Sequence, residues 1–216
     1  MSSSIWNRPA RGTRGPAPAH SRDEIVAAAM AMADSHGLGA VSMRAVASAL
    51  NTGAGSLYRY LSSRDDLLDL MTDRAVDELR PYPEISGDWL DAMVRMARRQ
   101  LQLYRAHPWL IDILPRPTAI GPAGLAWLDH CLAILRPVPA APTAKFEAIA
   151  MMTGVTTLFA RSEAAGPPAG FADIDMTAYP NLVAAFTAPP ASAPRDLFEA
   201  TVRGVLRGLL SEPPPP

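Results

Sequence analysis

The sequence has a single cysteine, Cys131, and no long run of apolar residues. One cysteine excludes an internal disulfide framework and is typical of proteins from a reducing cytoplasm. The longest apolar-leaning stretch, residues 148–160, is too short and too rich in threonine to cross a bilayer. No apolar segment follows the N-terminal arginines, so we do not expect a signal peptide. These absences predict a cytoplasmic protein without a membrane partner.

The motifs of common enzyme classes are missing as well. The sequence contains no HExxH, no paired CxxC, no glycine-rich phosphate loop and no GxSxG, and its four histidines are scattered. The run Asp129-His130-Cys131 lies in a helical pattern, where consecutive side chains point about 100° apart and cannot converge. We therefore expect no enzyme, no catalytic or metal site and no cofactor.

The charge is unevenly distributed. The net charge is −1, but residues 1–64 carry seven arginines against three acidic residues, a balance of +4 that leaves −5 for the remainder. A basic N-terminal part beside an acidic remainder favours a polyanionic partner that binds the N-terminal part alone. A chance gradient in an arginine-rich sequence remains an alternative.

No stretch alternates with the period of two that a half-buried strand requires, and the apolar residues instead recur at helical spacing. The 22 prolines mostly separate these helical segments. Ser21 and Glu24 have the spacing of a capping box at the first of them. The expected organisation is a flexible basic arm, a first helical domain, a larger helical domain and a proline tail, over residues 1–20, 21–80, 85–211 and 212–216.

The most informative stretch runs from Met43 to Tyr60. Two short helical patterns are joined by Asn51-Thr52-Gly53, and asparagine tolerates the left-handed conformation that a tight turn needs. This length and punctuation are typical of a helix-turn-helix, whose second helix enters the DNA major groove. Double-stranded DNA is therefore the expected partner.

Several motifs between residues 21 and 70 resemble the N-terminal domain of TetR-family transcriptional repressors. The motifs are Ile25-x-x-Ala28-Ala29-x-x-Met32, Gly37, Ser42-x-Arg44-x-Val46-Ala47, Ser56-Leu57-Tyr58-x-Tyr60 and Arg64-x-x-Leu67-Leu68. Farther along, Leu103-Tyr104-x-x-His107-Pro108-Trp109-Leu110 resembles the regulatory domain of tetracycline repressors. The resemblance implies an all-α fold, with an N-terminal three-helix helix-turn-helix head followed by a larger helical ligand-binding and dimerisation domain.

The sequence departs from the family pattern at three places. Asn51-Thr52-Gly53 replaces the usual Gly-Val-Ser turn, Arg64 replaces a lysine, and Tyr60-Leu61 replaces an aromatic–phenylalanine pair. The first departure preserves a turn, the second preserves the charge, and the third changes packing more than chemistry.

The resemblance also implies which residues meet DNA. They are Ser42, Met43, Arg44, Gly53, Ala54, Gly55, Tyr58, Arg59, Tyr60 and Arg64. Arg44 pairs bidentately with a guanine, contacts a phosphate, or forms a salt bridge with a nearby acidic residue. The small residues Ala54 and Gly55 let the recognition helix approach the bases closely but supply few hydrogen bonds.

Three arginines of the N-terminal arm, Arg8, Arg11 and Arg14, stand among prolines and glycines. A flexible arginine arm can enter the minor groove. The alternative is a tail that only adds non-specific attraction to DNA.

A symmetric dimer that holds two heads about 34 Å apart reads a palindromic operator. As in the resembled family, two helices from each subunit would form a four-helix bundle. The expected interface residues stand at helical spacing in two segments: Phe146, Ile149, Thr153 and Gly154, and Phe198, Val202, Val205, Leu206 and Leu209. The alternative is that these stripes pack inside one subunit.

The resemblance further implies a pocket for a small apolar or aromatic effector of unknown identity. Its candidate lining residues are Trp89, Met93, Met96, Trp109, Trp127, Met151, Met152, Val155 and Phe159. Ordinary core packing is the alternative for each of them. Possible polar contacts in the same domain are Arg98, Arg99, His107 and His130.

Together these features predict a ligand-responsive repressor that binds its operator as a homodimer and leaves it when the effector binds. An activator and a helical adaptor that binds only protein are the alternatives. A steep dependence of DNA affinity on salt would distinguish a DNA-binding protein from an adaptor.

Overall fold

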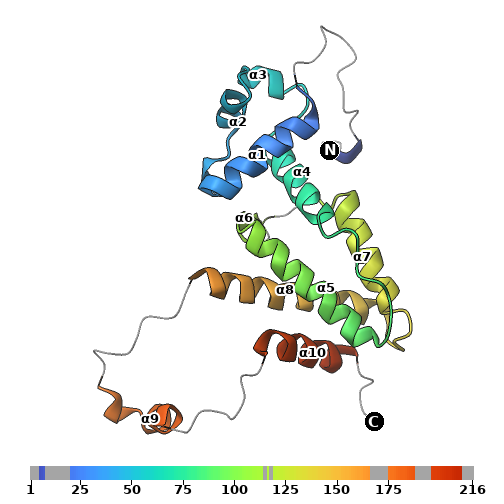
Figure 1. The fold of residues 1–216 in the computed structure, drawn as a ribbon, viewed down its shortest axis with the longest axis vertical. Helices are drawn as coiled ribbons and strands as arrows, with labels where there is room; N and C mark the ends of the chain where they lie inside the picture. Colours follow the sequence, from blue (N-terminus) through green and yellow to red (C-terminus); the bar gives the residue numbers. More distant parts are fainter. Residues whose placement is uncertain are drawn as a thin grey trace.

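The computed structural model describes residues 5–7, 20–113, 116, 119–165, 175–187 and 196–210, and every regular element in these residues is helical. Figure 1 shows their arrangement. The α-helices are α1 (Arg22–His36), α2 (Met43–Ala49), α3 (Ala54–Leu57), α4 (Arg64–Asp77), α5 (Trp89–Ala106), α6 (Trp109–Ile113), α7 (Pro122–Ile134), α8 (Pro142–Ala165), α9 (Pro180–Thr187) and α10 (Leu197–Leu210). Three short 3₁₀ turns are η1 (Ile5–Asn7), η2 (Leu38–Ala40) and η3 (Met176–Ala178).

The head, residues 20–63, consists of α1 to α3. The expected capping box is present, because Ser21 Oγ accepts from the Glu24 N–H and the Glu24 carboxylate accepts from the Ser21 N–H. Apolar side chains from all three helices and from α4 are fully buried together, among them Ile25, Val46 and Leu57. This small core fixes α2 and α3 against α1.

The turn between α2 and α3 is a Schellman motif. Asn51 adopts φ 52°, its N–H donates to Ser48 O at 3.0 Å, and the Thr52 N–H donates to Ala47 O at 2.9 Å. The expected left-handed asparagine is therefore confirmed. It lets the chain leave α2 and enter α3 within three residues.

Replacing Asn51 by alanine is expected to lower the free energy of unfolding by about 1 kcal/mol, because a β-carbon without a short polar side chain disfavours this conformation. Asn51→Gly is the matched control and should unfold close to wild type, because glycine adopts positive φ freely. Thermal or chemical unfolding measures both. An alanine variant as stable as the glycine variant would contradict the argument.

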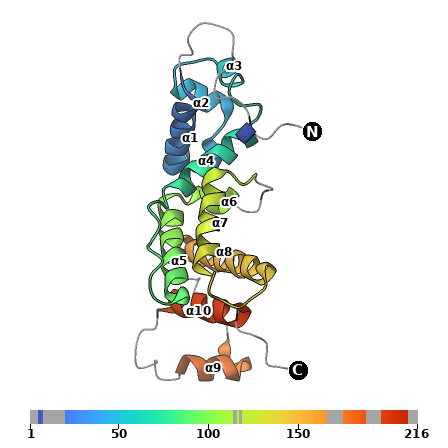
Figure 2. The ribbon, with the colours of Figure 1, turned by 90° about the vertical axis from the view of Figure 1, so that its right-hand side faces the viewer.

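Helix α4 links the head to the larger domain. It begins at the cap formed by Ser63 Oγ, which accepts from the Asp66 N–H at 3.0 Å. It then packs on α1 on the head side and along α7 on the other side. Helices α5, α8 and α10 pack on one another below it, and α9 lies apart from them (Figures 1 and 2).

The helical segments expected from the sequence are all present, with shifted ends. Helical spacing predicts helices from Ser86 to Ala106 and from about Pro194 to Leu210, whereas α5 begins at Trp89 and α10 begins at Leu197. Helix α3 ends at Leu57, and residues 58–60 follow it as turns. No helix among the described residues is long and apolar enough to cross a membrane.

Part of the N-terminal segment is packed against the larger domain. Ile5 is 2% exposed, and a β-carbon at Gly121 would lie 2.6 Å from Cη2 of Trp6. Glycine at position 121 therefore makes room for the Trp6 ring. Arg8, Arg11 and Arg14, as well as residues 212–216, lie outside the described residues, so the arm and the proline tail stay predictions.

Candidate DNA interface and ligand cavity

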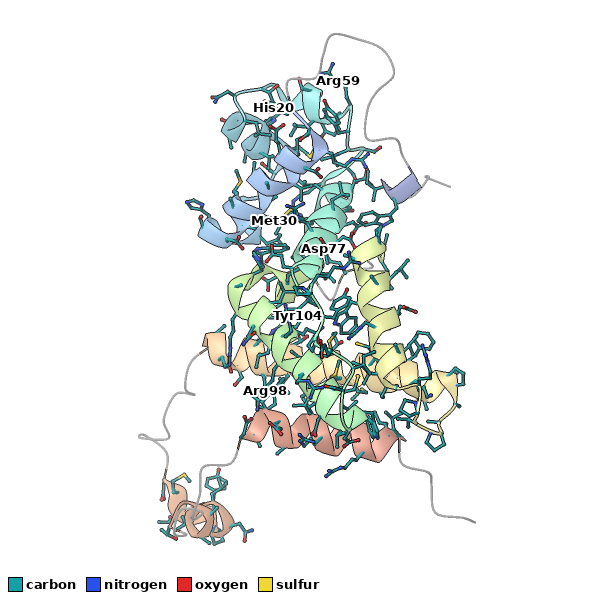
Figure 3. All side chains as sticks on the ribbon, turned by 45° about the vertical axis from the view of Figure 1, so that its right-hand side comes forward. His20, Met30, Arg59, Asp77, Arg98 and Tyr104 are labelled. Atoms are coloured by element: carbon teal, nitrogen blue, oxygen red, sulfur yellow. The ribbon has the colours of Figure 1, made fainter. Side chains whose placement is uncertain are left out.

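The tip of the head presents a cation-bearing surface formed by α2 and by the residues that follow α3. Ser42 caps α2, with Oγ accepting from the Ala45 N–H at 3.1 Å. Arg44, Tyr58 and Arg59 are exposed, and Figure 3 shows Arg59 at the end of the molecule opposite Arg98. Within the described part of the chain, the Arg44 and Arg59 side chains form no hydrogen bond or ion pair.

The start of α3 offers space rather than hydrogen-bonding groups. Gly53 precedes the helix, and nothing lies within 4 Å of a β-carbon built at Gly53 or Gly55. Ala54 is half-buried between them and packs on the core. A double helix can therefore approach the backbone here closely.

The structure corrects the expectation that the side chains of Met43 and Tyr60 face DNA, and it shows hydrogen bonds within the chain for Arg64, whose contact with DNA stays a prediction. Met43 is 7% exposed and packs in the core of the head, so its side chain does not reach the surface. Tyr60 is also buried, and its hydroxyl donates to His20 O at 2.8 Å. Arg64 is exposed, but its Nε donates to Val41 O at 2.8 Å and its Nη2 to Leu38 O at 3.1 Å. Both polar side chains thus tie parts of the head together.

A cavity of about 600 Å³ lies between the linking helix and the larger domain. Side chains of α4, α5, α7 and α8 line it, together with residues 119–121 before α7. The apolar lining includes Val76, Leu79, Leu103, Trp127, Leu128 and Phe146. A cavity of this size accommodates a drug-sized molecule.

A polar cluster occupies one part of the lining. The Gln100 Nε2 donates to the Tyr104 hydroxyl at 3.0 Å and lies 3.5 Å from Thr153 Oγ1. Burial raises the pKa of Tyr104, so its hydroxyl stays protonated at neutral pH. Gln100 Oε1 and Trp127 Nε1 are buried without a hydrogen-bonding partner among the described residues.

Two carboxyl groups of α4, Asp69 and Asp73, also line the cavity. Asp73 Oδ1 accepts from the N–H groups of Ala123 and Gly124, at 2.9 and 3.1 Å, and so caps the first turn of α7. Burial raises the pKa of both carboxyls, although N–H donors near α7 oppose the shift. Negative charge in the wall disfavours an anionic ligand.

Of the nine residues expected to line a ligand pocket, only Trp127 lines this cavity. Met93, Met96 and Met152 are fully buried in the core, and Trp109 is 2% exposed. Met151 is 52% exposed on the surface of α8. Trp89, Val155 and Phe159 are partly buried against the core elsewhere, with Phe159 in edge contact with Phe198. The cavity forms instead where α4 meets α5, α7 and α8.

The expected dimer residues fall into three sets, and Ile149 belongs to the first two. Ile149, Phe198, Val202 and Leu206 are at most 6% exposed and pack inside the protomer, which corrects that part of the expectation. Phe146, Ile149 and Thr153 line the cavity. Gly154, Val205 and Leu209 remain accessible on α8 and α10.

Part of the outer surface of α8 and α10 carries exposed apolar side chains and small residues. Leu158 is 65% exposed, and Met151 and Leu209 are exposed as well. Nothing lies within 4 Å of a β-carbon built at Gly154, Gly204 or Gly208. We call the exposed residues Met151, Gly154, Leu158, Gly204, Gly208 and Leu209 the α8–α10 face.

The polar side chains considered for ligand binding have structural partners. Arg98 pairs with Asp196 and Glu199 at the start of α10, and Arg99 donates to Pro81 O. His130 stacks on Tyr82 at 4.7 Å between ring centroids. None of the three lines the cavity. The fourth candidate, His107, contacts the head and the end of α4.

Comparisons with known proteins agree with this arrangement. Residues 25–71 match the model of bacterial regulatory proteins of the tetR family, and residues 81–211 match the tetracyclin repressor-like C-terminal domain. The chain belongs to the TetR family, whose members are transcriptional regulators rather than enzymes.

Individual relatives extend the comparison. The chain is 39% identical over 161 residues to the HTH-type transcriptional repressor DrrR1 of Streptomyces coeruleorubidus, covering 74% of this chain and 59% of that protein. It is 32% identical to an HTH-type transcriptional regulator of Saccharopolyspora erythraea, covering 61% and 55%. The matches therefore span less than two thirds of the length of these relatives. The structure of ActR from Streptomyces coelicolor in complex with actinorhodin superposes with a TM-score of 0.76 at 28% identity, covering 91% of this chain and 98% of ActR.

Proposed function

We propose that the protein is a transcriptional repressor that binds a palindromic operator as a homodimer and is released by a neutral, mostly apolar effector. The observation that carries the proposal is the cavity of about 600 Å³, because α4 forms one of its walls and also supports the head. A molecule that fills the cavity therefore acts on the helix that sets the position of the DNA-binding surface.

On DNA, Arg44 and Arg59 supply the charge and Tyr58 supplies a phosphate contact. All three side chains are exposed at the tip of the head, and Tyr58 is 56% exposed. The open start of α3 allows close approach to the base edges, and Arg44 at the start of α2 is the candidate for guanine readout. Tyr60 supports this surface from inside the head, and Arg64 supports it through its hydrogen bonds to Val41 O and Leu38 O.

Dimerisation uses the α8–α10 face. A glycine leaves room for the backbone of a partner helix, and three of them occur on this face. Apolar side chains beside them would otherwise remain in water. Two copies related by a two-fold axis would pack α8 and α10 of each subunit into a four-helix bundle and leave both heads free.

The effector is proposed to be a polycyclic molecule with a few carbonyl or hydroxyl groups. The apolar wall favours the ring system, whereas Gln100, Tyr104 and Thr153 offer hydrogen bonds along one side. Asp69 and Asp73 disfavour a carboxylate on the ligand. Binding shifts α4, changes the spacing of the two heads and lowers operator affinity, with coupling typically worth about 1–3 kcal/mol.

The proposal is tested first without an effector. The protein is used to select fragments from genomic DNA of the source organism, and bound fragments are compared by gel shift at two salt concentrations. Selection of a palindrome, with affinity that falls steeply as salt rises, supports the repressor. Enrichment of no sequence over random DNA would contradict it and favour an adaptor.

Replacing Arg44 by alanine is expected to weaken binding to the selected operator by roughly tenfold to a hundredfold, corresponding to the loss of about 1–3 kcal/mol. Arg136→Ala removes an exposed arginine after α7 and is the matched control. If Arg44 reads a base, its loss also reduces discrimination between the operator and a variant operator. An Arg44 variant that binds as wild type would exclude the assigned role.

Effector candidates are then added to the operator complex. The candidates are pairs of matched polycyclic compounds, one neutral and the other with an added carboxylate. Neutral compounds are expected to release DNA at lower concentration than their carboxylate partners. The opposite order would contradict the chemistry assigned to Asp69 and Asp73.

A further inference from the structure

His107 joins three parts of the molecule that are distant in sequence. It lies between α5 and α6 and is 9% exposed. Its Nδ1 lies 2.7 Å from Asp34 Oδ1 of α1, and its Nε2 lies 3.1 Å from Glu78 Oε2 at the end of α4. Trp109 Nε1 donates to the same Asp34 oxygen at 2.6 Å. One imidazole ring thus connects the head, the linking helix and the larger domain.

The ends of α4 and α5 near His107 also form part of the cavity wall. Val76 and Leu79 line the cavity on either side of Glu78 in sequence. Leu103 and Tyr104 line it one turn before His107 on α5. Figure 3 shows Tyr104 in the middle of the molecule and Asp77 above it at the end of α4. A displacement of α4 relative to α5 therefore changes the distance between Glu78 and His107.

We propose that an interdomain latch is formed by Asp34, Glu78, His107 and Trp109. Both carboxylates bind the His107 ring only when the ring is protonated, so protonation helps to position the head for operator binding. The four residues are positioning residues, because they act on the head and not on DNA. The proposal rests on the proposed function for its effect on DNA, whereas the latch itself is measurable without DNA.

The chemistry of imidazole explains the requirement for a proton. Both ring nitrogens face a carboxylate, and only the imidazolium form carries a donor on each. Neutral imidazole keeps one N–H and turns a lone pair toward the other carboxylate. Glu78 is the more exposed partner and the more distant one, so deprotonation is expected to release Glu78 and retain Asp34.

Burial of the imidazole favours its neutral form, but the hydrogen bonds to Asp34 and Glu78 outweigh burial and raise the pKa of His107 above its ordinary value. Because the pKa is raised in the folded state, the latch contributes its full stabilisation below about pH 6.5. This stabilisation is lost as the pH rises through the pKa of His107 in the folded protein. The charged groups acting on the ring are Asp34 from α1 and Glu78 from α4. Arg105, at the end of α5, pairs with Glu163 of α8 and not with Asp34 or Glu78.

The effect on DNA follows from preorganisation. Two heads that are held in place lose less conformational freedom when they occupy two half-sites than two heads that move on their domains. Opening the latch should therefore weaken operator binding. In wild type this weakening appears on raising the pH from 6 to 8.5.

The first test needs no DNA. Proton NMR follows the four histidines in wild type, and the His107 signal is assigned from its loss in His107→Gln. We expect the pKa of His107 to lie above 6.5 in wild type and to be lower in Glu78→Gln. This substitution changes an exposed side chain and should not prevent folding. His36→Gln, at an exposed position of α1, is the matched control and should leave the His107 titration unchanged. A His107 pKa at or below 6.5, or one that Glu78→Gln does not lower, would overturn the latch.

The second test measures affinity for the selected operator at pH 6 and pH 8.5. We expect the dissociation constant of wild type and of His36→Gln to rise roughly fivefold, and that of Glu78→Gln and His107→Gln to rise much less. An equal rise in all four proteins would overturn the positioning role. A protein that shows the expected NMR titration but selects no operator would contradict the proposed function and leave the latch standing.

Discussion

Replacing Leu158 by glutamate is expected to convert the dimer into a monomer and to weaken operator binding by roughly a hundredfold or more, because two linked heads gain avidity that one head lacks. Leu158 is 65% exposed on α8, so the substitution removes no packing inside the protomer. In a dimer through the α8–α10 face it would bury a carboxylate beside its symmetry partner. Light scattering measures the mass, and gel shift measures the affinity.

Ile85→Glu is the matched control for this substitution. Ile85 is 54% exposed in the segment between α4 and α5 and is not one of the residues of the α8–α10 face. It should remain a dimer with wild-type operator affinity. A Leu158 variant that stays dimeric would show that the subunits associate through another surface.

The helix boundaries and the turn of the head could be predicted, because the sequence features that set them involve residues close together in the chain. Ser21, Ser42 and Ser63 each cap a helix through a hydrogen bond to a residue three positions along. Asn51 has the conformation that its residue type and its place between two helical patterns indicated. Such features depend on neighbours within one or two turns, and these neighbours can be recognised in one sequence.

The roles of individual apolar residues were not predictable in the same way. Helical spacing indicates that Phe198, Val202 and Leu206 share one face of α10, but it does not say whether that face meets α8 of the same chain or of a partner. In the structure the face is buried on α8 and α5 of its own chain. The glycines on the opposite face, which carry the weaker sequence signal, are the accessible ones.

The roles of polar residues in and beside the head were likewise not predictable from the sequence. The residue types of Tyr60 and Arg64 fit phosphate contacts, and both lie near the expected surface. Their hydrogen bonds go to carbonyl groups of His20, Val41 and Leu38, which are 23 to 40 residues away in sequence. A single sequence does not reveal such pairings, because they depend on how the three helices and α4 come together.

The cavity is the clearest case of a long-range feature. Its wall joins Val76 of α4, Gln100 of α5, Trp127 of α7 and Thr153 of α8, and no sequence period connects these positions. Methionine content pointed instead to Met93, Met96 and Met152, which fill the core. The family resemblance therefore indicated the domain that borders the cavity without locating the cavity within it.

Filling the cavity should separate effector binding from DNA binding. Ala150 lines the cavity and is exposed on α8, so Ala150→Trp adds a large ring at the cavity without overpacking the core. We expect the affinity for an effector to fall by roughly tenfold or more, because the added indole takes up volume that the ligand needs. Operator affinity without effector should stay close to wild type, since Ala150 lies on neither the head nor α4. Isothermal titration measures the first quantity, and gel shift measures the second.

Ala184→Trp makes the same change at an exposed position of α9 that does not line the cavity. It should bind effector and operator as wild type does. If Ala150→Trp binds effector as tightly as Ala184→Trp, the effector occupies a different site and the link from cavity to α4 is wrong. If it instead loses operator affinity with no effector present, the expected separation of effector binding from DNA binding is wrong, and the mass of the variant then shows whether the added ring acts through the α8–α10 face, which holds Gly154 one turn further along α8.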